Sequence, residues 1–108
     1  MTPKSVVLRA AAQRDIEEAA THYLEEAGPE VALRFIDSVE QAFRHIAGNP
    51  GSGSPRYGHE LNLPGLRSWP LGSYPHLVFY MVGRGRVDVW RVLHGQRDIP
   101  VWMAEGGA

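Results

Sequence analysis

The sequence contains no cysteine and, among its 108 residues, a single lysine, Lys4. Without cysteine the chain can form neither a disulfide framework nor a thiolate metal site, which suits a reducing compartment. Long apolar runs are also missing. No stretch approaches the ~18 residues that a membrane span requires, and the N-terminal segment lacks the apolar core of a signal peptide. The length fits one compact domain, so we expect residues 1–108 to form a single cytoplasmic domain.

Positive charge in the C-terminal part of the chain is carried by arginine alone. Residues 1–48 carry five basic and eight acidic side chains, whereas residues 49–108 carry six arginines and four acidic side chains. Arginine offers a planar fork of donors that suits carboxylate and phosphate groups, so this part is the better candidate for contact with an anionic partner. A bias in codon usage would produce the same enrichment. The net charge of −1 argues against strong nucleic-acid binding.

Two amphipathic helices are predicted near the N-terminus. Apolar residues recur at steps of three and four over residues 11–27 and again over residues 29–47. Gly28 and Pro29 separate the two segments, because glycine tolerates the left-handed backbone at a helix end and proline fits a first helical position. So short a connection predicts an antiparallel hairpin. The apolar stripe of the second helix comprises Ala32, Phe35, Ile36, Val39, Phe43 and Ile46.

Strands are predicted before and after this hairpin. Residues 5–9 read as a short buried strand. Residues 49–65 hold four glycines and three prolines in seventeen positions, which predicts a long loop. Residues 66–71, 76–82 and 86–94 then predict an antiparallel meander, followed by a frayed tail with apolar residues able to dock. The expected fold class is α+β: an N-terminal strand and an antiparallel helical hairpin packed on an antiparallel β-sheet.

Both faces of the predicted sheet are partly apolar. Strict alternation places Leu77 and Phe79 opposite Val78 and Tyr80 in one strand. In the last strand it groups Val87, Val89, Arg91 and Leu93 on one face, and Arg86, Asp88, Trp90, Val92 and His94 on the other. One helical hairpin covers one face. The second face is covered either by the loop and the tail or by another protein, and we expect an interaction groove there.

Four residues could form a nuclease site. Cleavage of RNA by internal transfer needs a base, an acid and a cation for the developing phosphorane charge. Glutamate and histidine supply the proton transfers, and arginine supplies the cation. The candidates are Glu60, Arg67, Arg91 and His94. Alternatively, Arg91 pairs with Asp88 and Arg97 with Asp98 in strand-end ion pairs worth less than ~1 kcal/mol.

Neither a metal nor a cofactor is indicated by the sequence. His94 and Asp98 are a possible ligand pair, but no second pair follows at a suitable spacing. The segment GSGSP at residues 51–55 lacks the lysine and the strand-to-helix context of a phosphate-binding loop. We therefore expect a protein that works without a bound ion or prosthetic group.

Several short segments, taken in order, carry a family resemblance. The segments RFID, NPGSG, LR, VFY and RVLHGQRD together resemble the ParE branch of the RelE/ParE toxin superfamily, of plasmid stabilisation type, over residues 6–99. The resemblance implies the same helical hairpin on an antiparallel sheet. It also implies a small cytoplasmic bacterial toxin, encoded beside an antitoxin that binds and neutralises it. Members of the ParE type are associated with inhibition of DNA gyrase, whereas RelE-type relatives cut messenger RNA on the ribosome.

The sequence departs from the RelE-type pattern in its basic residues. The loop and the sheet contain no lysine, and no tyrosine follows His94. Arg67 matches the arginine of the second strand, and Arg91 and His94 lie near the basic positions of the last strand, so the set is incomplete. We therefore favour a toxin that poisons DNA gyrase and is held by a ParD-like antitoxin. The alternatives are a ribosome-dependent endoribonuclease and an inactive member that only binds its antitoxin.

The resemblance and the apolar sheet together predict two contact surfaces. Aromatic anchors dominate the interfaces that bind a folding peptide segment. The expected antitoxin contacts are therefore Tyr74, Tyr80, Trp90 and Trp102. The basic residues of the last strand and of the turn after it, namely Arg91, His94 and Arg97, are the expected target contacts.

Overall fold

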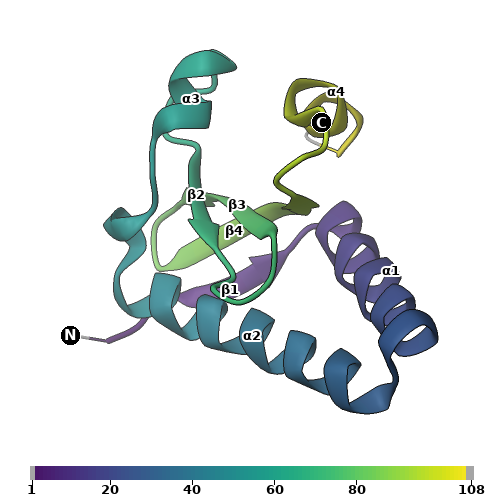
Figure 1. Ribbon diagram of the computed structural model, residues 1–108. Helices are drawn as coiled ribbons and strands as arrows, with labels where there is room; N and C mark the ends of the chain where they lie inside the picture. The colour runs from purple at the N-terminus through teal and green to yellow at the C-terminus, as the bar shows by residue number, and fades with distance from the viewer. Residues whose placement is uncertain (1, 107–108) are drawn as a thin grey trace.

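The computed structural model of the protein describes residues 2–106, which form four strands and five helical segments in one chain (Figure 1). The order of the elements is β1 (Ser5–Leu8), α1 (Ala10–Ala27), α2 (Pro29–Gly48), η1 (Pro50–Ser52), α3 (Arg56–Glu60), β2 (Arg67–Pro70), β3 (His76–Val82), β4 (Arg86–His94) and α4 (Ile99–Gly106). Among the described residues, no helix is both long enough and apolar enough to cross a membrane.

The helical hairpin forms as predicted. Gly28 adopts a φ of 93°, and its N–H donates to the carbonyl of Leu24, which ends α1. Pro29 then occupies the first turn of α2, where a missing N–H costs no hydrogen bond. The buried stripe of α2 consists of Phe35, Val39, Ala42, Ile46 and Ala47. This stripe packs on the sheet, whereas Ile36 and Phe43 of the predicted stripe are only partly buried.

The strands form one mixed sheet with the order β1-β4-β3-β2. The meander of β2, β3 and β4 is antiparallel, and the bounds of β3 and β4 match the prediction. β1 pairs in parallel with β4, with Val6 opposite Val87. The helical hairpin therefore serves as the crossover that brings the N-terminal strand beside the last strand.

A bulge in β4 changes which side chains share a face. Phe79 pairs with Arg91 but Tyr80 pairs with Val89, so Trp90 is an extra residue. Beyond it, Val92 lies in the core cluster that contains Val89, and Leu93 lies in the opposite cluster. The strict alternation expected for this strand is therefore wrong after Trp90, and it is correct for β3.

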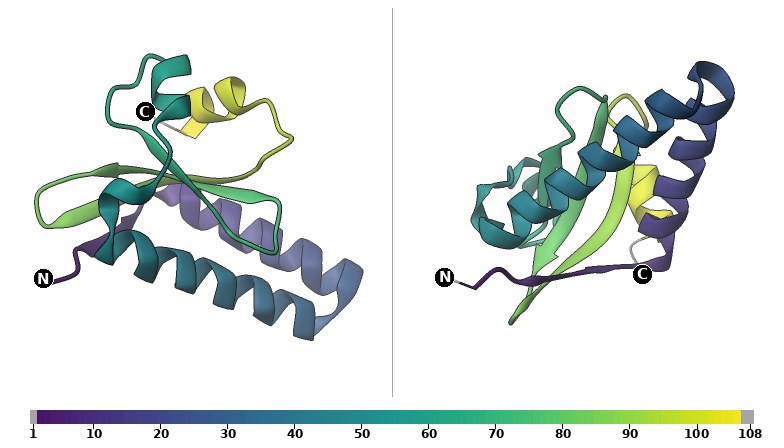
Figure 2. Two further views of the ribbon diagram at one scale, coloured as in Figure 1. Left: turned by 60° about the vertical axis from the view of Figure 1, so that its left-hand side comes forward. Right: turned by 90° about the horizontal axis from the view of Figure 1, so that it is seen from below.

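Helices cover both faces of the sheet. α1 and α2 lie on one face, and α3 and α4 lie on the other (Figure 2). The core against α1 and α2 includes Phe35, Ile46, Val78, Tyr80, Val87 and Val89. The second core holds Leu66, Phe79, Leu93, Ile99 and Met103, with Tyr57, Trp90 and Trp102 packed at its border. The groove expected on the second face is therefore not open, because α3, the residues after it and α4 fill it.

The C-terminal segment is a helix where a frayed tail was expected. Asp98 precedes α4, and its side-chain Oδ1 and backbone carbonyl accept the N–H groups of Val101 and Trp102. Pro100 stands in the first turn of α4. The apolar face of this helix is anchored by Ile99 and Met103, each 3% exposed. Asp98 thus caps a helix, and the ion pair expected between Arg97 and Asp98 is not among the ion pairs of the described residues.

Candidate functional site

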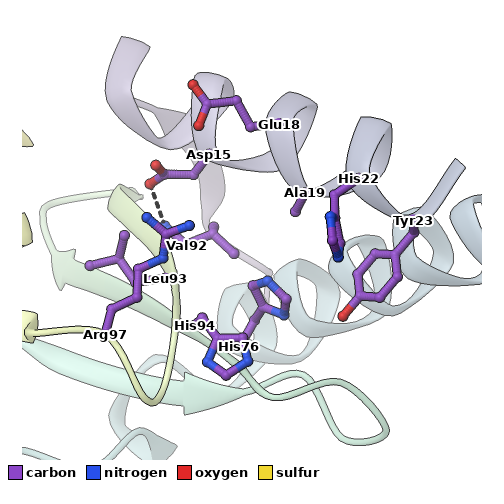
Figure 3. Close-up of a pocket in the computed structure, with 10 residues that line it drawn as sticks. All are labelled: Asp15, Glu18, Ala19, His22, Tyr23, His76, Val92, Leu93, His94 and Arg97. Atoms are coloured by element: carbon purple, nitrogen blue, oxygen red, sulfur yellow. Dashed lines mark hydrogen bonds between the residues drawn. The ribbon is translucent and has the colours of Figure 1, made fainter. Parts of the chain in front are cut away.

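A cavity of about 300 Å³ lies between α1 and the adjoining ends of β3 and β4 (Figure 3). Its α1 wall carries Asp15, Glu18, Ala19, His22 and Tyr23, and its sheet wall carries His76, Val92, Leu93, His94 and Arg97. His76 and His94 are opposite one another in the β3–β4 ladder, so both side chains leave the sheet on the side of α1. Their ring centroids are 5.4 Å apart.

His76 is the most deeply buried titratable residue that lines this cavity. It is 8% exposed, and its ring packs against the ring of Phe35 at 5.2 Å. Burial, followed by the neighbouring His94 and Arg97, lowers the pKa of His76 from 6.5 to about 4. His76 is therefore neutral at physiological pH. Its Nδ1 is buried and has no hydrogen-bond partner among the described residues.

His94 and Arg97 belong to the turn that follows β4. The N–H of Gln96 donates to Nδ1 of His94 at 3.1 Å, so a neutral His94 carries its proton on Nε2. The N–H of Arg97 donates to the carbonyl of His94, which closes the turn. The guanidinium of Arg97 lies 4.1 Å from the ring centroid of Trp102 on α4. Both side chains can therefore donate hydrogen bonds to a ligand from fixed positions.

Arg91 is committed to the interior of the protein. Its Nε and Nη2 donate to the two carboxylate oxygens of Asp15, each at 2.7 Å, and its Nη1 donates to the carbonyl of Trp102. The side chains of Arg91 and Asp15 are 6% and 9% exposed. The partner expected for Arg91, Asp88, pairs instead with Arg86. Arg91 therefore holds α1, β4 and α4 together, and it does not present its guanidinium to a target.

The four nuclease candidates are each engaged in separate local contacts. Glu60 accepts a hydrogen bond from Arg56 on the exposed surface of α3. Arg67 donates to the carbonyl of Gly53 at 2.7 Å, and Arg91 binds Asp15. His94 alone of the four lines the cavity. No pair of these residues exchanges a hydrogen bond among the contacts of residues 2–106, so the structure does not assemble them as an acid and a base.

The segment NPGSG at residues 49–53 has a structural explanation. The N–H of Gly53 donates to the hydroxyl of Tyr80, and that hydroxyl donates to the carbonyl of Pro50. A Cβ on Gly53 would overlap the Tyr80 hydroxyl and would lie 2.9 Å from the carbonyl oxygen of Ser68. This segment therefore fastens the loop after α2 onto β2 and β3.

The four aromatic residues expected at an antitoxin interface lie on different faces of the sheet. Tyr80 is fully buried, at 0% exposed, and serves the core. Tyr74 packs on the α1–α2 side and donates its hydroxyl to the carbonyl of Val31. Trp90 and Trp102 are half-buried at the border of the opposite core. Tyr74 and Tyr80 thus lie on one side of the sheet and Trp90 and Trp102 on the other, so the four residues cannot line one groove.

Sequence reasoning did not identify several residues of the cavity wall. It named His94 and Arg97 but assigned no role to Asp15, His22 or Tyr23, which face the sheet from α1. The step of seven from Asp15 to His22 places both on one face of a helix, which is the only sequence signal for them. Among residues 2–106, no three histidine, aspartate or glutamate side chains converge as a metal site requires.

The sequence matches a protein-family model over most of its length. The model for the ParE toxin of the type II toxin–antitoxin system parDE matches residues 6–99. The chain belongs to the ParE toxin family. The family match runs from the second residue of β1 to the first residue of α4, so it contains the sheet except for Ser5, together with the helical hairpin and the cavity.

The chain is also similar to individual ParE proteins in sequence and in structure. Toxin ParE1 of Mycobacterium tuberculosis, from two strains, is 35% identical to this chain over 94 residues, which cover 86% of this chain and 91% of ParE1. A solved structure described as the chromosomal ParDE TA system from P. aeruginosa superimposes with a TM-score of 0.71 at 22% identity. The superposition covers 84% of this chain and 95% of that chain. The two proteins therefore share a fold.

Proposed function

We propose that this ParE family member arrests bacterial growth by binding and poisoning DNA gyrase in the cytoplasm, and that a ParD-like antitoxin neutralises it. One observation favours a mechanism by binding over catalysis: Glu60, Arg67 and Arg91 each hydrogen-bond to a different partner and not to one another. A nuclease would need these groups to converge on one phosphate with His94. A toxin that acts by binding needs only an accessible surface.

The residues available for target binding are those at the end of β4. Arg97 is exposed and His94 is half-buried, so both can meet a target protein. Arg91 is removed from the set of direct contacts, because its guanidinium is buried against Asp15. It supports the surface indirectly, since it holds α4 and the turn in place. We therefore assign the target contact to His94 and Arg97.

The antitoxin is expected on the side of the sheet that carries α4. Trp90 and Trp102 present part of their rings there, and Arg9 lies 4.1 Å over the ring of Trp90. Half-buried tryptophans flanked by cations offer both apolar area and charge to an incoming peptide segment. Tyr74 remains a candidate contact only for a segment that reaches around to the helical hairpin.

Purified protein with DNA gyrase and relaxed plasmid tests the proposed target. We expect the wild type to inhibit supercoiling, and the variant Arg97→Ala to inhibit at least ~10-fold less, in line with the loss of one charged interface contact. Arg84→Ala removes an exposed arginine from the β3–β4 turn and serves as the matched control. Unimpaired supercoiling at protein concentrations that stop growth would exclude gyrase as the target.

The competing nuclease reading has its own assay. Primer extension on messenger RNA from induced cells should show no cleavage by the wild type, and Arg67→Ala/His94→Ala should leave the pattern unchanged. Cleavage that the double variant abolishes would establish the RelE-type function in place of ours. A protein that neither cuts messenger RNA, nor inhibits gyrase, nor slows growth would be an inactive member that only binds its antitoxin.

A further inference from the structure

The cavity beside α1 contains a polar atom that the chain does not satisfy. Nδ1 of His76 is buried, and no described residue donates to it or accepts from it. A buried polar group without a partner costs about 1–3 kcal/mol, and native proteins almost always pair such groups. Nδ1 is closed to solvent although His76 lines a cavity of about 300 Å³, so an occupant of that cavity pairs with this atom only when the imidazole ring rotates toward it.

The groups around this atom are mainly donors. A neutral His94 carries its proton on Nε2, because its Nδ1 accepts the N–H of Gln96. Arg97 adds a guanidinium, and Tyr23 adds a hydroxyl. The carboxylate of Asp15 has its oxygens occupied by Arg91 and by the N–H of Val92. An occupant that accepts hydrogen bonds therefore fits this wall.

The charge and the shape of the cavity further restrict the chemical class of ligand that it can bind. Arg91 offsets the charge of Asp15, and the carboxylate of Glu18 points away from the two imidazoles of the sheet wall (Figure 3). One guanidinium and the neutral imidazole of His76 suit a single negative charge better than a phosphate dianion, which would meet two nearby carboxylates. The side chains of Ala19, Val92 and Leu93 supply an apolar wall for methylene groups.

We propose that this cavity binds a carboxylate carried on a short aliphatic stem, such as the side chain of a glutamate in an acidic peptide segment. The carboxylate accepts hydrogen bonds from His76, from His94 and from Arg97, and its methylenes lie against Val92 and Leu93. The site is assigned by the cavity and its donors alone, so it stands whether or not gyrase is the target of the toxin.

Binding of a carboxylate at this site is coupled to uptake of a proton by His76. The titratable and charged groups that face His76 are Asp15, Glu18, His22 and Tyr23 from α1, with His94 and Arg97 from the sheet side. A carboxylate that enters among them favours the protonated imidazole and raises the pKa of His76 from about 4. A complex that takes up a proton becomes tighter as pH falls. The affinity for the carboxylate therefore rises as the pH falls toward about 4, the pKa of His76 in the free protein.

Histidine ring resonances in NMR titrations test the site on the intact protein. The probes are acetate, a short neutral peptide with one central glutamate, the same peptide with glutamine, and inorganic phosphate. We expect the glutamate peptide to shift the resonances of His76 and His94 saturably, and to bind more tightly at pH 5 than at pH 7.5. Acetate shifting the same resonances as well would show that a free carboxylate suffices. The glutamine peptide should shift neither.

Two double variants locate the binding. His94→Ala/Arg97→Ala should lower the affinity of the protein for the glutamate peptide at least ~10-fold, as expected for the loss of two charged or polar donors. His59→Ala/Arg84→Ala removes an exposed histidine and an exposed arginine elsewhere and should leave the affinity unchanged. Circular dichroism and thermal melts establish that both variants fold. Equal shifts with the glutamine peptide, saturation by phosphate alone, or an absence of saturable shifts at both pH values would overturn the proposal.

Discussion

Asp15 and Arg91 form a two-point ion pair between α1 and β4, with both oxygen-to-nitrogen distances at 2.7 Å. Asp15 also accepts the N–H of Val92 at 3.0 Å. β1 ends opposite Val89, so the edge of β4 beyond that residue has no strand neighbour. The carboxylate of Asp15 takes the place of the missing strand there, and Arg91 neutralises the charge that this requires.

The variant Asp15→Asn should be strongly destabilised. It leaves the buried guanidinium of Arg91 without its counter-charge, and the removal of one partner of a buried ion pair costs about 3–5 kcal/mol. The free energy of unfolding in urea measures the loss. Glu17→Gln, an exposed change on the same helix, should fall within about 0.5 kcal/mol of the wild type. Similar stability of the two variants would contradict the role given to Asp15.

Gly53→Ala should destabilise the protein by about 1–3 kcal/mol, because the added methyl group overlaps the hydroxyl of Tyr80 in a closely packed region. Gly51→Ala is the matched control in the same loop, since nothing lies within 4 Å of its Cβ position. Thermal denaturation of both variants makes the comparison. If the control lost as much stability as Gly53→Ala, the contact with Tyr80 would not be the cause.

Stability should fall as the pH is lowered below 6.5, because of His76. The pKa of this histidine is about 4 in the folded protein and 6.5 without the fold, so between these values the unfolded chain binds a proton that the folded protein excludes. The contribution of His76 to the free energy of unfolding is at its full value above pH 6.5, and about 2 kcal/mol of it is lost by pH 5. Urea unfolding between pH 5 and 7.5 measures the slope.

The variant His76→Phe isolates this contribution from the other histidines. Phenylalanine keeps a ring against Phe35 and Tyr23 but binds no proton. The difference in stability between wild type and variant should therefore change with pH by the amount assigned to His76. A difference that stays constant from pH 5 to 7.5 would show that His76 titrates normally in the folded protein.

Trp90→Ala/Trp102→Ala should weaken binding of the antitoxin at least ~10-fold in a calorimetric titration, because buried tryptophan rings dominate interface energies. Trp69→Ala tests the third tryptophan, which stacks on His45 at 4.0 Å on the α2 side of the sheet. It should leave the affinity unchanged. Circular dichroism first establishes that each variant is folded. Unchanged affinity of the double variant would remove both residues from the interface.

Much of the fold was predictable because it follows from local periodicity. The three-and-four spacing of α1 and α2, with Gly28-Pro29 between them, specifies the hairpin. The α4 helix had a readable signal in Asp98 followed by Pro100, but eight residues after a polar turn resemble a tail. Coverage of the second sheet face by the loop and the tail was one of the two alternatives that the sequence left open, and the structure shows it, with the tail folded as α4.

The candidate site was less predictable because the β-bulge at Trp90 determines which residues of β3 and β4 lie opposite each other. From the pairing of Val82 with Val87, a regular hairpin would set His76 opposite Leu93. The extra residue at Trp90 shifts the register by one and brings His94 opposite His76. Nothing in the alternation of VDVWRVLH marks that shift. Asp15 lies 76 residues from Arg91 in sequence, so their pairing was likewise invisible.

The parallel pairing of β1 with β4 has a consequence for synthesis of the toxin. Ser5 is opposite Arg86, and Leu8 is opposite Val89, so β1 cannot pair until β4 has left the ribosome. Until then the apolar side of the helical hairpin has only an incomplete sheet to pack on. A nascent chain halted before residue 86 therefore lacks the neighbour of its first strand, and the sheet is completed only after β4 has been synthesised.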